Sequence, residues 1–311
     1  METSRKQIIL DCDPGHDDAV AILLAAAAQE LDLLGITTVA GNSYLENTTR
    51  NALSLCTLAG IDVPVCPGIG RPLVREQITA HEVHGPSGLD GAELPEPKRK
   101  SGENAVDFIA DQVSAHPGKI TLVAVGPLTN IATFLIRYPE LTEAVGSLVF
   151  MGGGIGFGNV TPAAEFNIYA DPEAAAVVFK SSIETTMFPL DLTHQVMIAD
   201  AEIATIRSAG SPVANALADL LTYTLRTCQT LFGLKAAPLL HDPCTIIYLT
   251  HPGLFEVNRY WGGVELKGEY TYGQTVVDRW GVTGRPPNIQ VAERVDREAF
   301  LEVLYELLGR Y

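Results

Sequence analysis

Four aspartates fall within eight residues of the sequence, grouped around a Pro-Gly turn. They are Asp11, Asp13, Asp17 and Asp18, in the segment DCDPGHDD. One aspartate, Asp17 or Asp18, is enough to cap the helix that we expect to follow. Four clustered carboxylates repel one another unless a cation compensates their charge. Oxygen ligands without a nearby cysteine pair favour Ca²⁺ or Mg²⁺ over zinc, so this segment predicts a metal site.

A second candidate for chemistry is the segment His241-Asp242-Pro243. An aspartate followed by a proline at the first helical position is also an ordinary helix start. Considered together with the aspartate cluster, Asp242 becomes a candidate further metal ligand. His241, its neighbour, is a side chain that can exchange a proton near neutral pH.

Asn159 and the segment Glu165-Phe166-Asn167 follow a run of glycines. Amide and carboxylate side chains together offer donors and acceptors, which suits the hydroxyls of a sugar, although loop residues of these types are commonly only solvated. Two other patterns are set aside. The histidines of His81-Glu82-Val83-His84 are three residues apart rather than four, and the following Gly-Pro stops the helix that a zinc motif needs. The glycine spacings in residues 152–158 do not open a helix with a downstream acid, as a dinucleotide fingerprint requires.

The elements that must position these residues alternate between strand and helix over the first two thirds of the chain. We expect strands at Gln7–Cys12, Leu33–Ala40, Val63–Cys66, Ile120–Val125, Ser147–Met151 and Thr185–Leu190. We expect helices at Asp17–Ala28, Glu46–Ala59, Glu103–Ala115, Leu128–Tyr138 and Pro172–Lys180. Apolar strands separated by helices predict a mostly parallel sheet that is covered on both faces.

The last third has a different pattern. We expect helices at Pro212–Phe232, Pro243–Thr250 and Arg297–Leu308, and strands at Val264–Leu266, Thr271–Val277 and Ile289–Val291 that extend the sheet. No linker or repeat divides the chain, so we expect one α/β domain over residues 1–311. The Gly-, Pro- and His-rich stretch from Arg71 to Gly102 is too long for a simple connection, which predicts a functional loop over a site.

Polar or glycine-rich residues follow each predicted core strand. The carboxyl ends of the strands form the ligand crevice in open α/β sheets. We therefore expect these loops, although far apart in the sequence, to converge on one site.

Composition limits the partners. The net charge is −16 over 311 residues, which argues against nucleic acid or an anionic membrane, because both need clustered Lys and Arg. The longest apolar run, Ala19–Ala28, is about half of a membrane span. The five scattered cysteines include no CxxC pair and favour free thiols in a reducing cytoplasm over a disulfide scaffold or a zinc site.

Taken together, these segments resemble the inosine–uridine-type nucleoside hydrolases. The likeness runs from near the N-terminus to about residue 244 and continues more weakly to the end. The matching segments are DCDPGHDD (11–18), Gly41-Asn42, His84-Gly85, VGPLTN (125–130), MGGG (151–154), AEFN (164–167), Asp171-Pro172-Glu173, LDLT (190–193) and HDPC (241–244).

The resemblance implies a mixed, mostly parallel sheet with a Rossmann-like core flanked by helices, assembled as a homotetramer or dimer. It also implies Ca²⁺-dependent hydrolysis of the N-glycosidic bond of ribonucleosides to ribose and free base. The implied Ca²⁺ ligands are Asp13, Asp18, Asp242 and the backbone carbonyl of Val125. The implied ribose contacts are Asp17, Asn42, Asn159, Glu165 and Asn167, with Met151 lining the sugar pocket. Phe166 is a further candidate substrate contact. Asp13 would also accept the proton of the attacking water, in a single displacement through an oxocarbenium-like transition state.

Base preference is read from fewer residues. His241 is the candidate acid for the leaving base, and His84 lies on the long loop that could close over the site. Relatives that favour pyrimidines carry a Gln and a Tyr before the His-Asp pair. Here Gln229 could read a base edge, whereas Phe232 could stack on a base but not donate a proton. We therefore expect uridine and cytidine as substrates, with inosine as an additional one.

Two other functions are compatible with part of the pattern. An Asp-x-Asp at a strand end also begins haloacid-dehalogenase-type phosphatases, in which Asp11 would be a nucleophile. That class needs a later Lys and an acidic pair on a separate strand, and the negative charge disfavours phosphorylated substrates. A calcium-dependent nucleoside or sugar sensor would need the ligands but neither a base at Asp13 nor an acid at His241.

Overall fold

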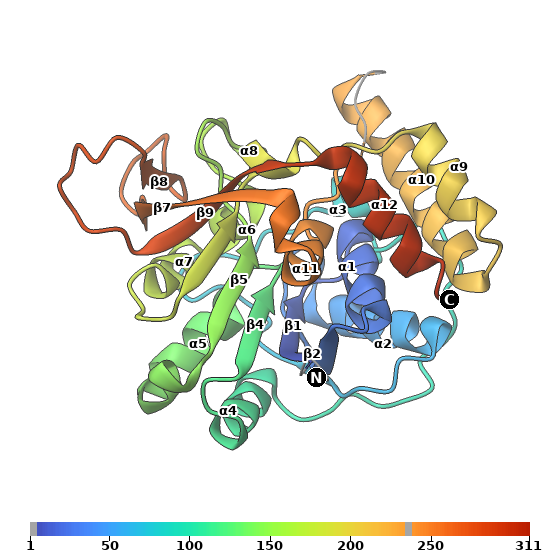
Figure 1. Ribbon diagram of the computed structural model, residues 1–311, viewed down its shortest axis with the longest axis horizontal. Coiled ribbons are helices and arrows are strands. Elements are labelled where there is room, and N and C mark those ends of the chain that lie inside the picture. The colour runs from blue at the N-terminus through green and yellow to red at the C-terminus, as the bar shows by residue number, and fades with distance from the viewer. Residues whose placement is uncertain (1–4, 234–237) are drawn as a thin grey trace.

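One mixed sheet organises the chain, of which this computed structural model describes residues 5–233 and 238–311. Nine strands in these residues pair in the order β3-β2-β1-β4-β5-β6-β9-β7-β8 (Figure 1). The strands are β1 (Lys6–Cys12), β2 (Leu31–Thr38), β3 (Val65–Pro67), β4 (Ile120–Ala124), β5 (Ser147–Met151), β6 (Thr185–Phe188), β7 (Phe255–Val264), β8 (Thr275–Asp278) and β9 (Ile289–Val295). Pairing is parallel from β3 to β9, and β7 runs antiparallel to both β9 and β8. The predicted α/β class with a mostly parallel, mixed sheet is confirmed.

Helices cover both faces of the sheet. They are α1 (His16–Ala27), α2 (Leu45–Ala59), α3 (His81–His84), α4 (Ala105–Ala115), α5 (Thr129–Arg137), α6 (Phe166–Ala170), α7 (Pro172–Val178), α8 (Leu190–Thr193), α9 (Asp200–Ser208), α10 (Pro212–Phe232), α11 (Pro243–Thr250) and α12 (Arg297–Leu308), with 3₁₀ turns η1 (Pro139–Ala144) and η2 (Pro252–Leu254). In Figure 1, α4, α5 and α7 lie on the opposite side of the sheet from α1, α2, α11 and α12.

The central strands are apolar along their whole length because successive side chains alternate between two hydrophobic cores, one on each face of the sheet. In β1, Ile8 and Leu10 belong to the core beneath α1, α11 and α12, whereas Ile9 belongs to the core beneath α4 and α5. β5 alternates in the same way, with Val149 on the first side and Phe150 on the second. A strand buried on both faces has a continuous apolar sequence, which is why these strands were predictable.

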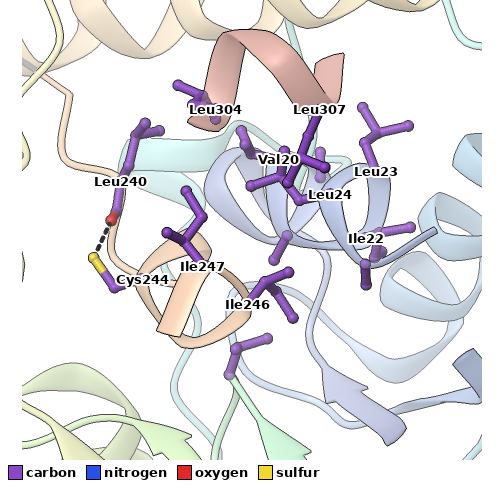
Figure 2. Packing of buried hydrophobic residues seen from close by; sticks show 14 of the residues in the cluster. Val20, Ile22, Leu23, Leu24, Leu240, Cys244, Ile246, Ile247, Leu304 and Leu307 are labelled. Atoms are coloured by element: carbon purple, nitrogen blue, oxygen red, sulfur yellow. Dashed lines mark hydrogen bonds between the residues drawn. The ribbon is translucent and has the colours of Figure 1, made fainter. Parts of the chain in front are cut away.

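The first core fixes the relative positions of α1, α11 and α12. Val20 and Leu24 of α1 meet Ile246 of α11 and Leu304 of α12 in a group of buried side chains (Figure 2). Burying each such side chain stabilises the fold by roughly 1.5–3 kcal/mol. Asp17 and Asp18 lie in the first turn of α1 and Asp242 directly precedes α11, so this packing brings the two acidic segments together.

The prediction was least accurate in the C-terminal strands. β7 covers Phe255–Val264 and was predicted only at its end, because its half-exposed residues mix aromatic and charged types. The predicted strand at Val264–Leu266 is wrong beyond Val264, and the predicted strand at Thr271–Val277 begins only at Thr275. The preceding residues form a turn in which Gly273 takes a positive φ of 81°. The short helices α6 and α8, and α9, were not predicted.

The stretch from Arg71 to Gly102 is mainly irregular, with α3 as a single helical turn. That turn ends at His84, and the next residue, Gly85, has a φ of 79°, as expected for a glycine that stops a helix. All five cysteines are free thiols, as predicted. No helix among residues 5–233 and 238–311 has the length and apolar character needed to cross a bilayer.

Candidate active site

The polar loops meet at the carboxyl ends of the parallel strands. Contacts join the segments after β1, β2, β4 and β5, and Asn42 and Asn167 make several of them. Asn42, after β2, bonds to Asp13 and Asp18 after β1. Asn167, on α6, bonds to the carbonyls of Val125 after β4 and Met151 at the end of β5. The loops that follow these strands therefore converge, as the positions of their polar residues predicted.

Three carboxylates form the centre of the site. Asp17, Asp18 and Asp242 each offer an oxygen, and these oxygens all lie within 4.8 Å of one another. Asp242 precedes Pro243 at the start of α11, and no side-chain capping bond from it is found among the described residues. Its role is therefore not the ordinary helix cap that the sequence allowed.

Asp18 has both roles that the sequence allowed. Its Oδ2 accepts a hydrogen bond from the backbone N–H of Gly15 at 3.0 Å, which caps α1. Its Oδ1 accepts the backbone N–H of Asp13 at 3.0 Å. The same side chain also belongs to the carboxylate cluster, so capping and clustering coincide in one residue.

Asp13 lies next to this cluster and is fully buried. Its Oδ2 accepts the backbone N–H of Asn42 at 2.6 Å, while its buried Oδ1 has no hydrogen-bond partner among the described residues. Gly41 and Gly126 pass so close that a Cβ at either position would collide with this carboxylate. Two glycines thus leave room for the Asp13 side chain, and one of its oxygens is left for a ligand or a proton.

The acidic side chains are costly to ionise together. Burial and then the neighbouring Asp18 raise the pKa of Asp13 well above its usual value. Burial and then Asp17 raise the pKa of Asp18 to about 7, and burial followed by Asp17 and Asp18 raises the pKa of Asp242. A divalent cation would compensate this repulsion, and the all-oxygen donor set with an unpartnered Asp13 Oδ1 fits such an ion.

A second group of residues lies on and around α6. Glu165 caps this helix by accepting the N–H groups of Asn167 and Ile168, and it also accepts the N–H of Gly153 at 2.8 Å. Burial raises the pKa of Glu165 to about 7. The Nδ2 of Asn167 donates to the Val125 carbonyl at 2.8 Å and contacts Met151. The structure thus groups four predicted site residues, Glu165, Asn167, Val125 and Met151.

Other predicted residues are less clearly assembled. Asn159 is exposed, and its Oδ1 accepts the backbone N–H of the half-buried Phe166 at 2.9 Å. This bond orders the loop. No hydrogen bond between Asn159 and the carboxylates is found among the described residues. Gln229 is half-buried on α10. The side chain of Phe232 lies outside the described part of the chain.

His241 lies beside Asp242 at the edge of the cluster. Its Nδ1 is 2.7 Å from the hydroxyl oxygen of Thr193, and its ring lies 5.9 Å from that of His194. Burial and then His194 lower the pKa of His241 to about 3. The imidazole is therefore neutral at physiological pH, with one nitrogen held by Thr193, so the expectation that His241 titrates near neutral pH is wrong because the ring is buried.

The long loop of residues 71–102 reaches the aspartate segment through His84. His84 is buried, its Nδ1 lies 2.8 Å from Nδ1 of His16, and the two rings stack. His16 Nε2 donates to the carbonyl of Asp90 at 2.7 Å, and Tyr223 of α10 stacks on its other side. His16 and Tyr223 were not predicted. His16 lies inside the aspartate motif, but nothing in the sequence indicated Tyr223.

Comparison with known proteins agrees with this geometry. The family model described as inosine-uridine preferring nucleoside hydrolase matches residues 8–302. Two curated relatives, from Shewanella woodyi and Salmonella arizonae, are both named pyrimidine-specific ribonucleoside hydrolase RihA. Each is 48% identical to this chain, over 309 and 307 residues, which is 98% of this chain and 99% and 98% of the relatives.

Solved structures agree as well. A purine-preferring ribonucleoside hydrolase from Gardnerella vaginalis superposes with a TM-score of 0.92 at 32% identity, over 98% of both chains. The plant nucleoside hydrolase PpNRh1 superposes with a TM-score of 0.89 at 34% identity, over 98% of this chain and 99% of that one. Fold, site and relatives together define a hydrolase of N-glycosyl bonds. The chain belongs to the inosine-uridine preferring nucleoside hydrolase family.

Proposed function

We propose that this enzyme hydrolyses the N-glycosidic bond of uridine and cytidine, and also of inosine, to ribose and free base. The observation that carries the proposal is the group of Asp17, Asp18 and Asp242, of which Asp18 and Asp242 are buried, with Asp13 and its unpartnered oxygen beside it. A concentration of negative charge in a crevice suits a reaction in which positive charge develops on the sugar ring.

The cation that fits this donor set is Ca²⁺, held by Asp13, Asp18, Asp242 and the Val125 carbonyl. When bound, it would hold and acidify the attacking water. Asp17 groups with Asp18 and Asp242 as closely as a ligand would, so it is a further candidate for the cation as well as for the ribose. The Val125 carbonyl already accepts one bond from Asn167, which leaves its second lone pair for the ion.

The protein residues supply the remaining steps. Asp13 accepts the proton of the attacking water at Oδ1, the oxygen that has no other partner among the described residues. Glu165, Asn167, Asn42, Asp17 and Asn159 hold the ribose hydroxyls, and Met151 forms the apolar floor of the sugar pocket. Holding the sugar in attack geometry removes much of the entropic barrier.

The base leaves on the side of His241, His84 and Gln229. His241, held at Nδ1 by Thr193, is the proposed acid: it takes a proton from solvent to become an imidazolium and passes one to the departing base, and its lowered pKa favours that transfer. The relatives named pyrimidine-specific support uridine and cytidine, at an identity of 48%. Inosine is included because a similar structure is titled purine-preferring and because His241 can donate to a purine ring.

A panel of nucleosides assayed for ribose release tests the proposal. Uridine and cytidine should release reducing sugar fastest, followed by inosine, and p-nitrophenyl phosphate should not be hydrolysed. Nucleoside binding without ribose release would instead support a calcium-dependent sensor. We also propose a cytoplasmic homotetramer or dimer, and light scattering of the purified enzyme would report the oligomeric state.

A further inference from the structure

A glycine-rich loop at the end of β5, residues 152–158, carries one large apolar side chain, Phe157. In the sequence, Phe157 is flanked by Gly156 and Gly158, and the residue is 38% exposed. A single exposed apolar side chain is ordinary on a protein surface. The position of Phe157, and the rigidity of the loop that carries it, are what give it significance.

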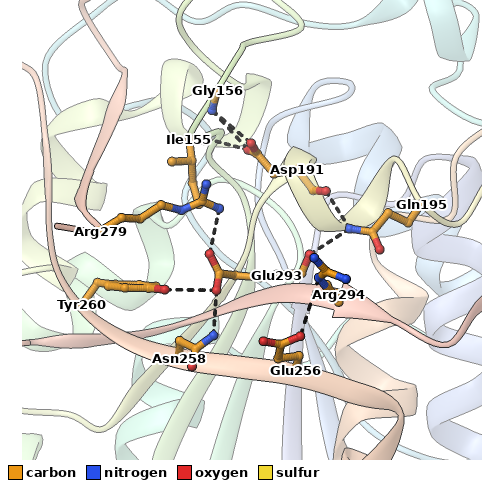
Figure 3. A network of polar contacts seen from close by, with 10 residues as sticks. All are labelled: Ile155, Gly156, Asp191, Gln195, Glu256, Asn258, Tyr260, Arg279, Glu293 and Arg294. Carbon is orange, nitrogen blue, oxygen red and sulfur yellow. Dashed lines mark hydrogen bonds and ion pairs between the residues drawn. The ribbon is translucent and has the colours of Figure 1, made fainter.

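The loop is held at two points, by Glu165 of the site and by Asp191 of α8. At its start, the N–H of Gly153 donates to Glu165, a proposed ribose contact. Further on, the N–H groups of Ile155 and Gly156 donate to the carboxylate of Asp191 at 2.6 and 3.1 Å (Figure 3). Between these anchors, Thr275 of β8 bonds both the N–H and the carbonyl of Gly154.

Asp191 is itself held firmly. It lies on α8, and its carbonyl accepts a bond from Gln195, whose Nε2 also reaches the carbonyl of Glu293 on β9. The carboxylate of Glu293 is bound in turn by Arg279, Asn258 and Tyr260 (Figure 3). The loop is therefore tied to the sheet through a continuous polar network.

The Phe157 ring is the first of three neighbouring rings. It packs edge-on against His194, with ring centroids 4.8 Å apart, and His194 lies 5.9 Å from His241. α8 ends at Thr193, which contacts His241, and His194 follows directly. The row of rings thus extends from the exposed loop to the residue that precedes Asp242.

We propose that Phe157 is a specificity-determining residue that packs against the base of the bound nucleoside, and that Asp191 is its positioning residue. The loop binds Glu165, a proposed ribose contact, through the N–H of Gly153, and Phe157 packs on His194, which lies beside His241. The loop thus connects the proposed ribose side with the proposed base side. The inference rests on the proposed function, because it needs a nucleoside in the site. Among the described residues, no hydrogen bond or ring contact joins Phe157 or Asp191 to Asp17, Asp18 or Asp242.

Steady-state kinetics of Phe157→Ala with uridine and inosine test the proposal. Aromatic contacts to a base are worth enough that KM should rise by about 10-fold. The Ki of an iminoribitol that has no base should stay unchanged, and Phe157→Tyr should keep the wild-type KM. Asp191→Asn, which loses one of its two acceptor oxygens, should raise KM in the same way while keeping Phe157. Ile136→Ala, at an exposed apolar position on α5, is the matched control and should match the wild type.

Two results would overturn the proposal. One is an unchanged KM for both nucleosides in Phe157→Ala. The other is a parallel loss of affinity for the iminoribitol, which would mean that the loop only shapes the sugar site. Both are distinct from failure of the proposed function, in which the wild-type enzyme itself releases no ribose.

Discussion

The hydroxyl oxygen of Thr193 lies 2.7 Å from Nδ1 of His241. Thr193 ends α8, and His241 immediately precedes the carboxylate cluster at Asp242. A hydroxyl can donate to Nδ1 or accept from it, so the contact is compatible with either tautomer of the ring. The contact orients the ring and engages Nδ1, so Nε2 is the nitrogen that serves the leaving base.

We expect His241→Ala to lower kcat for inosine by about 10²–10⁴-fold, the range for general acid assistance. A substrate such as p-nitrophenyl riboside has a leaving group that departs without protonation, so the same variant should stay near wild type. The paired rates are measured by ribose release and phenolate absorbance. Equal losses on the two substrates would mean that His241 only shapes the turn before Asp242, and would remove it from proton transfer.

Asp13→Asn should keep the shape of the side chain and lose the base. We expect kcat to fall by at least about 10²-fold, while binding of a nucleoside survives. Isothermal titration with substrate and stopped ribose assays separate the two effects. A matched control is Asp11→Asn, because Asp11 is equally buried but bonds Thr37 and Asn130 rather than facing the cluster. Near-normal turnover of Asp13→Asn would refute the assignment.

Prolonged treatment with EDTA should abolish activity and lower the melting temperature, because an ion that binds only the folded site stabilises it. Ca²⁺ added back should restore both properties. Elemental analysis of the purified enzyme should find about one Ca²⁺ per chain, as one cluster of oxygen ligands implies. Zinc in that analysis, or full activity after verified metal removal, contradicts the Ca²⁺ site.

The metal-free protein should become less stable as pH rises. Burial raises the pKa of Asp11, Asp18 and Glu165 to about 7. An acid with a raised pKa holds its proton more tightly when folded, so its contribution to stability is complete below an unfolded value of about 4. That contribution is lost as pH rises through about 7. Melting curves of chelated protein should therefore shift down between pH 5 and 8, and an upward shift would contradict the raised pKa values.

The central fold was predictable because its strands are apolar throughout and its helices begin and end at clear signals. β5, α10, α11 and α12 were predicted with the bounds that the structure shows. β7 was not, since a half-exposed strand at the edge of the main sheet mixes polar and aromatic residues without a regular period. The helical turns α6 and α8 are too short to show a period, and they form because Glu165 and the Gly153 carbonyl satisfy their first N–H groups.

The site was predictable where chemistry leaves a local signature. Clustered aspartates and the His-Asp-Pro segment identified the carboxylate centre from residue types alone. The expected carboxylate group was Asp13, Asp18 and Asp242, whereas the structure groups Asp17 with Asp18 and Asp242. That grouping depends on how α1 packs against α11. The contacts of His16 with Tyr223 and of Thr193 with His241 join residues far apart in the chain, so no local sequence pattern predicts them.

The packing of α11 against α1 has a consequence for how the protein is made. The carboxylate cluster combines residues near the N-terminus with Asp242, which leaves the ribosome only after most of the chain. During synthesis the first aspartates therefore cannot assemble the site, and a chain interrupted before α11 would bring mutually repelling carboxylates into a half-built core. A chain that ends before residue 242 therefore lacks one of the three clustered carboxylates, and with it a proposed ligand of the cation.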